Sequence, residues 1–189
     1  MHSLPTQHEP VWYLTRELRH GLVPGALAAW LLDPGSLTAR LMAACPGGFS
    51  VRVLSQRWHT PLHNESKRMG MQPRRMSFIR EVYLCCDGQP WVFARTVIPR
   101  KTLSGRQKHI ARLGSRPLGA VLFADPHMRR DEIEVSCLHP GERMYDQAAA
   151  ALADKPAVIW GRRSVFYLND KPLLVNEIFL PGIARAGTR

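Results

Sequence analysis

SFIREVYLCCDGQPWVFARTVIP, residues 77–99, predicts two alternating strands joined by the turn Asp87-Gly88, which is the strongest short-range signal of a β-hairpin. Side chains of a strand alternate between its two faces, so each strand carries one arginine in an apolar row. The two rows are Phe78, Arg80, Val82, Leu84 and Trp91, Phe93, Arg95, Val97. A guanidinium stays charged when buried and needs an anion from the protein or from a ligand. Two such arginines side by side suit a ligand with more than one carboxylate.

The opposite faces of both strands are also partly apolar, so the sequence leaves open which side faces the core. In the alternative interpretation the two arginines face water, or pair across the hairpin with Glu81 or another acid. Glu177 raises the same question on the last strand, where it shares a face with Leu173, Val175 and Phe179. A structural explanation is a salt bridge from Glu177 to Arg80, Arg95 or Arg163. Three charges on apolar strand faces favour a binding site.

The chain of 189 residues is long enough for one domain with a substantial core, and we expect a single domain over residues 1–189. Residues 1–10 are polar and expected to be loose. A helical pair is predicted over 24–48, a strand over 49–59 and a long connection over 60–75. After Pro99 the pattern predicts a helix over 104–113, a short second helix and strand-like character over 129–135. Residues 139–157 form a loop or a helical insertion, and Asn169-Asp170 joins a second hairpin between 158–168 and 171–181.

The charge is strongly positive, with 26 Lys plus Arg against 15 Asp plus Glu and a net charge of +11. Such a balance attracts anions, which include nucleic acid, a membrane surface and small acidic metabolites. The basic residues are dispersed and no DNA- or RNA-binding pattern is present, so we expect no nucleic-acid partner. A transient contact of the basic surface with a membrane stays open. The start of the sequence lacks the pattern of a secretory signal, and no segment is long enough to span a bilayer, which predicts a cytoplasmic protein.

The four cysteines are Cys45, Cys85, Cys86 and Cys137. They form no CxxC pair and no His/Cys cluster at zinc spacing, so we expect neither a metal site nor a disulfide framework. Reduced thiols in a cytosolic protein fit this usage best.

Four segments stand out when they are taken together: EVYLCCDGQPWVFARTVIP, LSG, LGSRPLGAVLF and WGRRSVFYLNDKPLLVNEIFLP. In this order they resemble chorismate pyruvate-lyase, the family that converts chorismate to 4-hydroxybenzoate and pyruvate at the start of ubiquinone biosynthesis. The resemblance covers most of residues 77–181 and, more weakly, the helical pair near 30–41. It implies a single-domain α+β fold around a six-stranded antiparallel sheet, with helical flaps closing an internal site and with no cofactor or metal.

The resemblance also implies site residues. The arginine that binds the ring carboxylate falls on Arg80 in FIREV, the second active-site arginine on Arg95 in ARTVIP, and the acid on Glu177 in NEIFLP. Glu177 and Arg95 are then the expected catalytic residues. Backbone groups that hold the product carboxylate fall on Leu118 in RPLG and on Leu37 in DPGSLTAR, where relatives have methionine. A backbone contact survives that change.

The charge pattern of the hairpin and the family resemblance agree, because two buried arginines suit a ligand with two negative charges and chorismate is a dianion. Elimination of enolpyruvate aromatises the ring, so the protein mainly supplies binding, orientation and charge stabilisation. Whether a general base takes the ring proton or the transfer is intramolecular stays open. We expect a monomer in which residues 24–45 and 114–128 act as lids. The alternative function is a non-enzymatic effector-binding domain of the same fold, although the residues before the hairpin do not resemble a DNA-binding domain.

Overall fold

Two long hairpins form the centre of one antiparallel sheet in the computed structural model, which describes residues 8–18 and 23–187. The first consists of β3 (Ser77–Cys86) and β4 (Gln89–Pro99), the second of β7 (Ile159–Leu168) and β8 (Lys171–Phe179). Both turns have two central residues with positive φ: 51° and 74° at Asp87 and Gly88, and 49° and 61° at Asn169 and Asp170. This is the geometry of the type I′ turn, whose twist matches that of the flanking strands. Both predicted hairpins are confirmed.

The sheet has the strand order β1-β6-β7-β8-β4-β3-β2, and β5 pairs with β7 outside this path. The remaining strands are β1 (Tyr13–Leu14), β2 (Phe49–His59), β5 (Arg129–Arg130) and β6 (Glu134–Leu138). Every pairing between these strands is antiparallel, as predicted. The expected number of six strands is wrong, since eight are found in the described ranges. The two additional strands, β1 and β5, are two residues long and too short to leave an alternating pattern.

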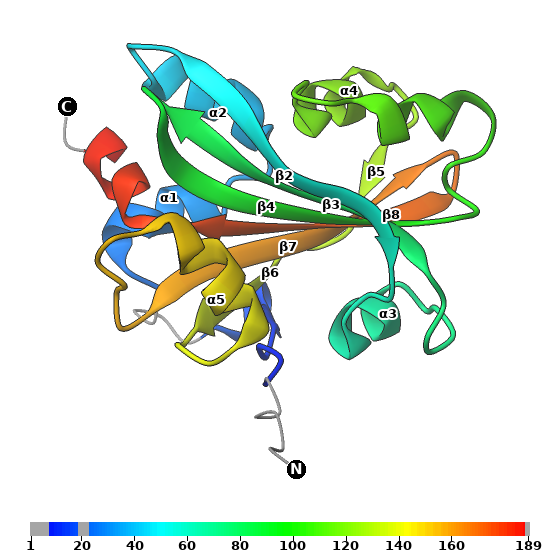
Figure 1. Cartoon of the computed structure of the whole chain (residues 1–189), viewed down its shortest axis with the longest axis horizontal. Coiled ribbons are helices and arrows are strands. Elements are labelled where there is room, and N and C mark those ends of the chain that lie inside the picture. The colour runs from blue at the N-terminus through cyan, green and yellow to red at the C-terminus, as the bar shows by residue number, and fades with distance from the viewer. Residues whose placement is uncertain (1–7, 19–22, 188–189) are drawn as a thin grey trace.

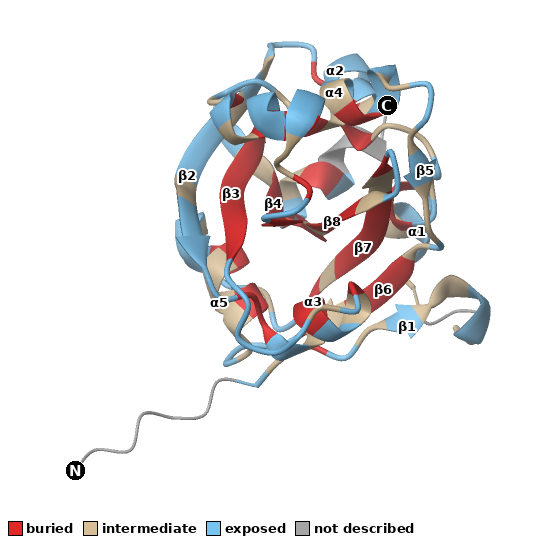
Figure 2. Ribbon diagram, turned by 90° about the vertical axis from the view of Figure 1, so that its right-hand side faces the viewer, coloured by how far each residue is buried: buried red, intermediate tan, exposed pale blue. Residues whose placement is uncertain are grey.

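Helices cover both faces of the sheet. In Figure 1, α2 (Leu37–Ala44) and α4 (Leu118–Ala124) lie above it, whereas α3 (His63–Arg68) and α5 (Arg143–Ala148) lie below. Figure 2 shows the strong curvature of the sheet and its buried central strands. Every residue of β3 is buried, while the edge strand β2 is mostly exposed. Because both faces of the central strands are covered, both carry apolar side chains, and alternation alone does not identify a core side.

The other helical segments are α1 (Gly25–Leu31) and the 3-10 helices Thr15–Glu17, Gly105–Arg112, Ala149–Ala151 and Pro181–Gly187. The predicted pair over 24–48 is confirmed as α1 and α2, and the Ser36 hydroxyl caps α2 by accepting from the Ala39 amide at 3.3 Å. The helix expected over 104–113 is a 3-10 helix. The segment 139–157 takes its helical alternative, because α5 buries Met144, Tyr145 and Ala148 against the sheet.

The expectation that residues 1–10 are loose lies partly outside the described residues. Of the described ones, His8 bridges to Glu142, and the Glu9 carboxylate accepts from the amides of His63 at 2.7 Å and Asn64 at 2.8 Å. Pro10 is buried. For residues 8–10 the expectation is therefore wrong, because Glu9 caps the first turn of α3.

A β-bulge in the first hairpin places its two arginines on opposite faces. Near the turn, Cys85 pairs with Pro90, but Leu84 already pairs with Val92, so Trp91 is the extra residue. Arg80 consequently pairs with Thr96, and Arg95 with Glu81. A shift of one residue moves every following side chain to the other face. The expectation that Arg80 and Arg95 lie side by side is wrong for this reason.

Cys45 and Cys86 form a disulfide with a Cα–Cα distance of 5.5 Å, whereas Cys85 and Cys137 are free. The expectation of four reduced thiols is wrong. The two bonded cysteines are 41 residues apart and meet because the end of α2 lies over the end of β3. No local sequence motif predicts this contact. The argument from thiol usage to a cytosolic location loses its basis, and that location stays a prediction. No helix in the described ranges has the length and apolar character needed to cross a bilayer.

Candidate active site

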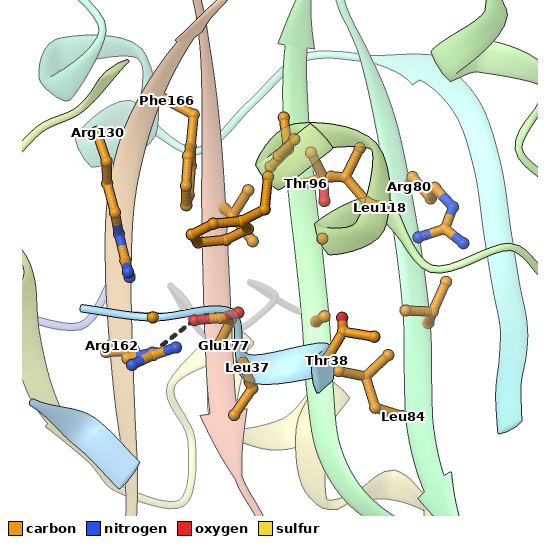
Figure 3. Close-up of a pocket in the computed structure, with 17 residues that line it drawn as sticks. Leu37, Thr38, Arg80, Leu84, Thr96, Leu118, Arg130, Arg162, Phe166 and Glu177 are labelled. Carbon is orange, nitrogen blue, oxygen red and sulfur yellow. Dashed lines mark hydrogen bonds and ion pairs between the residues drawn. The ribbon is translucent and has the colours of Figure 1, made fainter. Parts of the chain in front are cut away.

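A pocket lies between the sheet and the two helices above it (Figure 3). Its floor comes from β3, β4, β7 and β8, and its cover comes from α2 and α4. The apolar lining residues are Leu37, Val82, Leu84, Ala94, Leu118, Leu122, Phe123, Phe166 and Val175. These side chains form a slot for a flat apolar body such as a six-membered ring. Polar groups enter it from Thr38, Thr96, Arg80, Arg130, Arg162 and Glu177.

Arg80 stands at one end of the pocket without an acidic partner. Its Nη2 donates to the carbonyls of Gly114 at 2.9 Å and Arg116 at 3.0 Å, and its buried Nε has no hydrogen-bond partner in the part of the chain that the structure describes. Only 2% of Arg80 is exposed. Burial lowers the pKa of this guanidinium to about 10, so it stays protonated at neutral pH. A buried cation with a free donor is suited to a carboxylate.

Arg162 and Glu177 form an ion pair towards the other end of the pocket. The Arg162 Nε donates to the Glu177 Oε2 at 2.6 Å. The Arg162 Nη1 donates to the carbonyls of Trp30 at 2.9 Å and Asp33 at 2.6 Å, which fixes the end of α1 to the sheet. The Glu177 side chain is 16% exposed, so one of its oxygens remains available to a ligand. The acid predicted from the apolar row thus lines the pocket, with Arg162 as its partner.

Arg130 reaches into the pocket from β5. Its Nε donates to the Ser164 hydroxyl at 3.0 Å and its Nη1 to the Pro34 carbonyl at 2.9 Å. Burial and the neighbouring Arg162 lower its pKa to about 10, against the opposing effect of Glu177 and Asp33. The described lining residues therefore include three arginines and one glutamate, a formal balance of +2. That balance matches a ligand with two carboxylates.

The pocket is nearly closed. The volume open to water-sized molecules is about 40 Å³, room for a few waters and too little for a ring. The helices that cover it touch closely, because a Cβ on Gly119 of α4 would lie 2.7 Å from the Thr38 hydroxyl of α2. Entry of a ring-shaped ligand requires these helices to move apart.

Arg95 does not line the pocket. It lies on the opposite face of the sheet, where its Nε donates to Glu65 Oε1 at 2.9 Å, its Nη2 to Glu65 Oε2 at 3.1 Å and its Nη1 to Glu81. Burial opposes the charge, but Glu65 and Glu81 raise the pKa of Arg95 above its ordinary value. Asn176 adds a bond from its Nδ2 to Glu65 Oε1 at 3.0 Å. This pairing with Glu81 is the alternative that the sequence had left open.

Of the residues expected at the site, the structure brings together Arg80, Leu37, Leu118 and Glu177, and it separates Arg95 from them. Sequence reasoning missed Arg130 and Arg162. The signal for Arg162 was present, because a two-residue turn at Asn169-Asp170 pairs Leu168 with Lys171. Counting six residues back along β7 and six residues forward along β8 then pairs Arg162 with Glu177. No comparable signal exists for Arg130, whose strand is only two residues long.

The described lining residues include no histidine or cysteine, and Glu177 is their one carboxylate. Elsewhere in the described ranges, the group that meets the spacing of a metal site is Cys45, Cys86 and Asp87. Its two thiols are joined in the disulfide and are not free as ligands.

Two solved structures share this fold. The effector domain of PhnF from Mycobacterium smegmatis has a TM-score of 0.57 and 16% identity, covering 80% of this chain and 91% of that domain. A GntR-family transcriptional regulator from Bacillus cereus has a TM-score of 0.52 and 10% identity, covering 71% of this chain and 92% of that chain. At these identities the likeness shows the fold alone.

The sequence comparisons are more specific. A model of the chorismate lyase family matches residues 8–186. A protein of Aromatoleum aromaticum named "Probable chorismate pyruvate-lyase" is 45% identical over 168 residues, which are 88% of this chain and 90% of that protein. One of the same name from Pseudomonas fluorescens is 42% identical over 183 residues, covering 96% and 93%. The chain belongs to the chorismate lyase family, which confirms the resemblance seen in the sequence.

Proposed function

We propose that this protein is a chorismate pyruvate-lyase that converts chorismate to 4-hydroxybenzoate and pyruvate in the pocket under α2 and α4. The observation that carries the proposal is the pocket itself, an apolar slot with a balance of +2 and an arginine, Arg80, that has no acidic partner. Chorismate is a ring-shaped dianion. Family membership supplies the reaction, and the pocket supplies the matching shape and charge.

In the proposed arrangement the ring carboxylate binds Arg80, and the backbone near Leu37 and Leu118 completes its hydrogen bonds. The ring lies in the apolar slot, which directs its 4-oxygen towards Glu177. A ring held at both ends loses most of its orientational freedom before the chemistry begins. Planar bidentate pairing with a carboxylate is a property of arginine that lysine lacks.

The reaction breaks the C4–H bond and the ether C–O bond at C3. The C–H electron pair forms the ring double bond that completes aromaticity, and the ether pair leaves with enolpyruvate, which takes up a proton to become pyruvate. In one route Glu177 accepts the C4 proton. In the other route Glu177 holds the 4-hydroxyl while the leaving group takes the C4 proton. Both routes place the negative charge of the leaving group near Arg162 and Arg130, where cations stabilise it.

The test is turnover by the purified protein. Chorismate should be consumed with equal yields of 4-hydroxybenzoate and pyruvate, at the same rate with and without a chelator, because we expect no metal to take part. Absence of products contradicts the proposal. A rate lost on chelation and restored by a divalent ion overturns the metal-independent mechanism.

The alternative is an effector-binding domain without activity, since the fold of the regulators above is the same. Tight binding of chorismate or 4-hydroxybenzoate without turnover is the result expected of such a sensor. The family match over residues 8–186 favours the enzyme.

A further inference from the structure

Arg130 is held in place by contacts with neutral groups. Its backbone pairs with Phe166 of β7, and its guanidinium lies 5.0 Å from the centre of the Phe166 ring. The Ser164 hydroxyl and the Pro34 carbonyl accept from Nε and Nη1 and fix its direction. Figure 3 shows the side chain pointing along the pocket wall towards Arg162 and Glu177. In the described part of the chain it forms no ion pair.

The neighbouring Arg162 is already paired with Glu177, and its Nη1 donates to two backbone carbonyls. Among the described residues, Arg130 is therefore the cation on this side of the pocket that has no ion pair. Arg80 is too far away to serve the same anion, because β7, β8 and β4 separate β5 from β3 and put their backbones about 19 Å apart along the sheet at ordinary strand spacing. The pocket thus has two separate anion-binding positions, one at each end.

We propose that Arg130 binds the enolpyruvyl carboxylate of chorismate, an inference that rests on the proposed function. With the ring carboxylate on Arg80 and the 4-oxygen near Glu177, the ether substituent on the adjacent carbon projects towards the β5 and β7 side. The product 4-hydroxybenzoate has no group at this position. Arg130 accordingly discriminates substrate from product and contacts the leaving enolpyruvate as its charge develops, without contacting the product.

The test compares Arg130→Gln with Arg129→Gln, which removes the same charge from the adjacent, exposed residue outside the pocket. For Arg130→Gln, kcat/KM for chorismate should fall about 10- to 100-fold, the loss expected for a charged hydrogen bond. Its Kd for 4-hydroxybenzoate should stay within roughly a factor of two, because product binding does not use the lost contact. Arg129→Gln should match the parent in both measurements. Arg130→Lys keeps the charge and should recover part of the chorismate efficiency.

If Arg130→Gln lowers kcat/KM for chorismate and weakens the binding of 4-hydroxybenzoate by the same factor, the inference is contradicted, because such a result shows a general effect on the pocket. An unchanged kcat/KM contradicts it as well. If Arg130→Gln does not fold, Arg130→Lys is measured in its place. Its kcat/KM for chorismate should fall below that of the parent, while its Kd for 4-hydroxybenzoate stays the same. A parental kcat/KM together with a weakened Kd for 4-hydroxybenzoate overturns the assignment. Failure of the parent protein to convert chorismate is a separate outcome that overturns the proposed function itself.

Discussion

Arg95 is enclosed by Glu65, Glu81 and Asn176, whereas Arg80 donates to two backbone carbonyls and its own Nε has no hydrogen-bond partner among the described residues. The first environment is that of an ion-pair network, complete without a ligand. The second has no acid from the described part of the chain. We therefore expect different roles for these two buried arginines, Arg95 in stability and Arg80 in binding.

Replacing Arg95 by alanine leaves Glu65 and Glu81 buried without their cation, so the free energy of unfolding should fall by about 3 to 5 kcal/mol. Chemical denaturation of Arg95→Ala measures this. Under conditions where the variant stays folded, its Kd for 4-hydroxybenzoate should equal that of the parent. A stable Arg95→Ala protein with lost turnover would restore Arg95 as a catalytic residue, the role that the family resemblance implies.

Glu177→Gln keeps the shape of the side chain and removes the negative charge beside Arg162. Turnover of chorismate should drop by about 100-fold, in the range of general acid–base and electrostatic effects, while stability changes less. Glu177→Ala also opens a void and should lose stability as well as activity. Turnover and thermal unfolding measured on both variants separate the roles, and parental turnover in Glu177→Gln removes this residue from the mechanism.

At the scale of elements, α2 and α4 form a cover whose two halves touch at Thr38 and Gly119. Arg162 and Arg130 also hold the helical pair, since they donate to the carbonyls of Trp30 at the end of α1 and of Asp33 and Pro34 in the connection to α2. An anion bound at these arginines is thereby coupled to the position of the helical pair. This coupling supports the proposal that residues 24–45 and 114–128 act as lids.

Hydrogen exchange in 24–45 and 114–128 should slow when 4-hydroxybenzoate binds, because the bound ring packs against the inner side of the cover and opposes its opening. Gly119→Ala should speed release of the product, since the new methyl group meets the Thr38 hydroxyl and keeps the cover from closing. Gly25→Ala is the matched control: nothing lies within 4 Å of its new methyl group. Equal exchange with and without ligand would argue against the lids.

The disulfide ties the end of α2 to the end of β3, near the first hairpin turn. Unfolded and unreduced protein should contain two titratable thiols, those of Cys85 and Cys137. Cys45→Ser should lower the free energy of unfolding by about 2 to 4 kcal/mol, because the crosslink restrains a loop of 41 residues in the unfolded chain. Four thiols in the titration would show that the bond does not form.

For the whole molecule, local patterns predicted the hairpins and the helical pair because turn chemistry and alternation are local, whereas the antiparallel sheet was implied by the family resemblance. Two features could not be predicted from local sequence patterns. The bulge at Trp91 reversed the face of Arg95, and the disulfide depends on the contact between α2 and β3. Residues whose position follows from simple alternation, Arg80 and Glu177, were placed at the pocket; Arg130, on a strand of two residues, was not.

The two faces of the sheet also differ in charge. On the α3 side, the ion pairs of Arg68, Arg95 and Arg163 involve four acids, Glu65, Glu81, Asp131 and Glu134. On the α2 and α4 side, three arginines face one glutamate. Because the arginines on the α3 side are paired with acids and the other side has an excess of +2, we expect an anionic ligand to bind on the α2 and α4 side. A net charge of +11 for the whole chain adds a long-range attraction for such a ligand.

The most direct test of the proposed site is a crystal structure of the protein with 4-hydroxybenzoate. We predict the ring in the slot between the sheet and the α2–α4 cover, with the carboxylate on the Arg80 guanidinium and the hydroxyl within hydrogen-bond distance of Glu177. A product ring bound beside Arg95 on the opposite face, or a carboxylate directed away from Arg80, would contradict it.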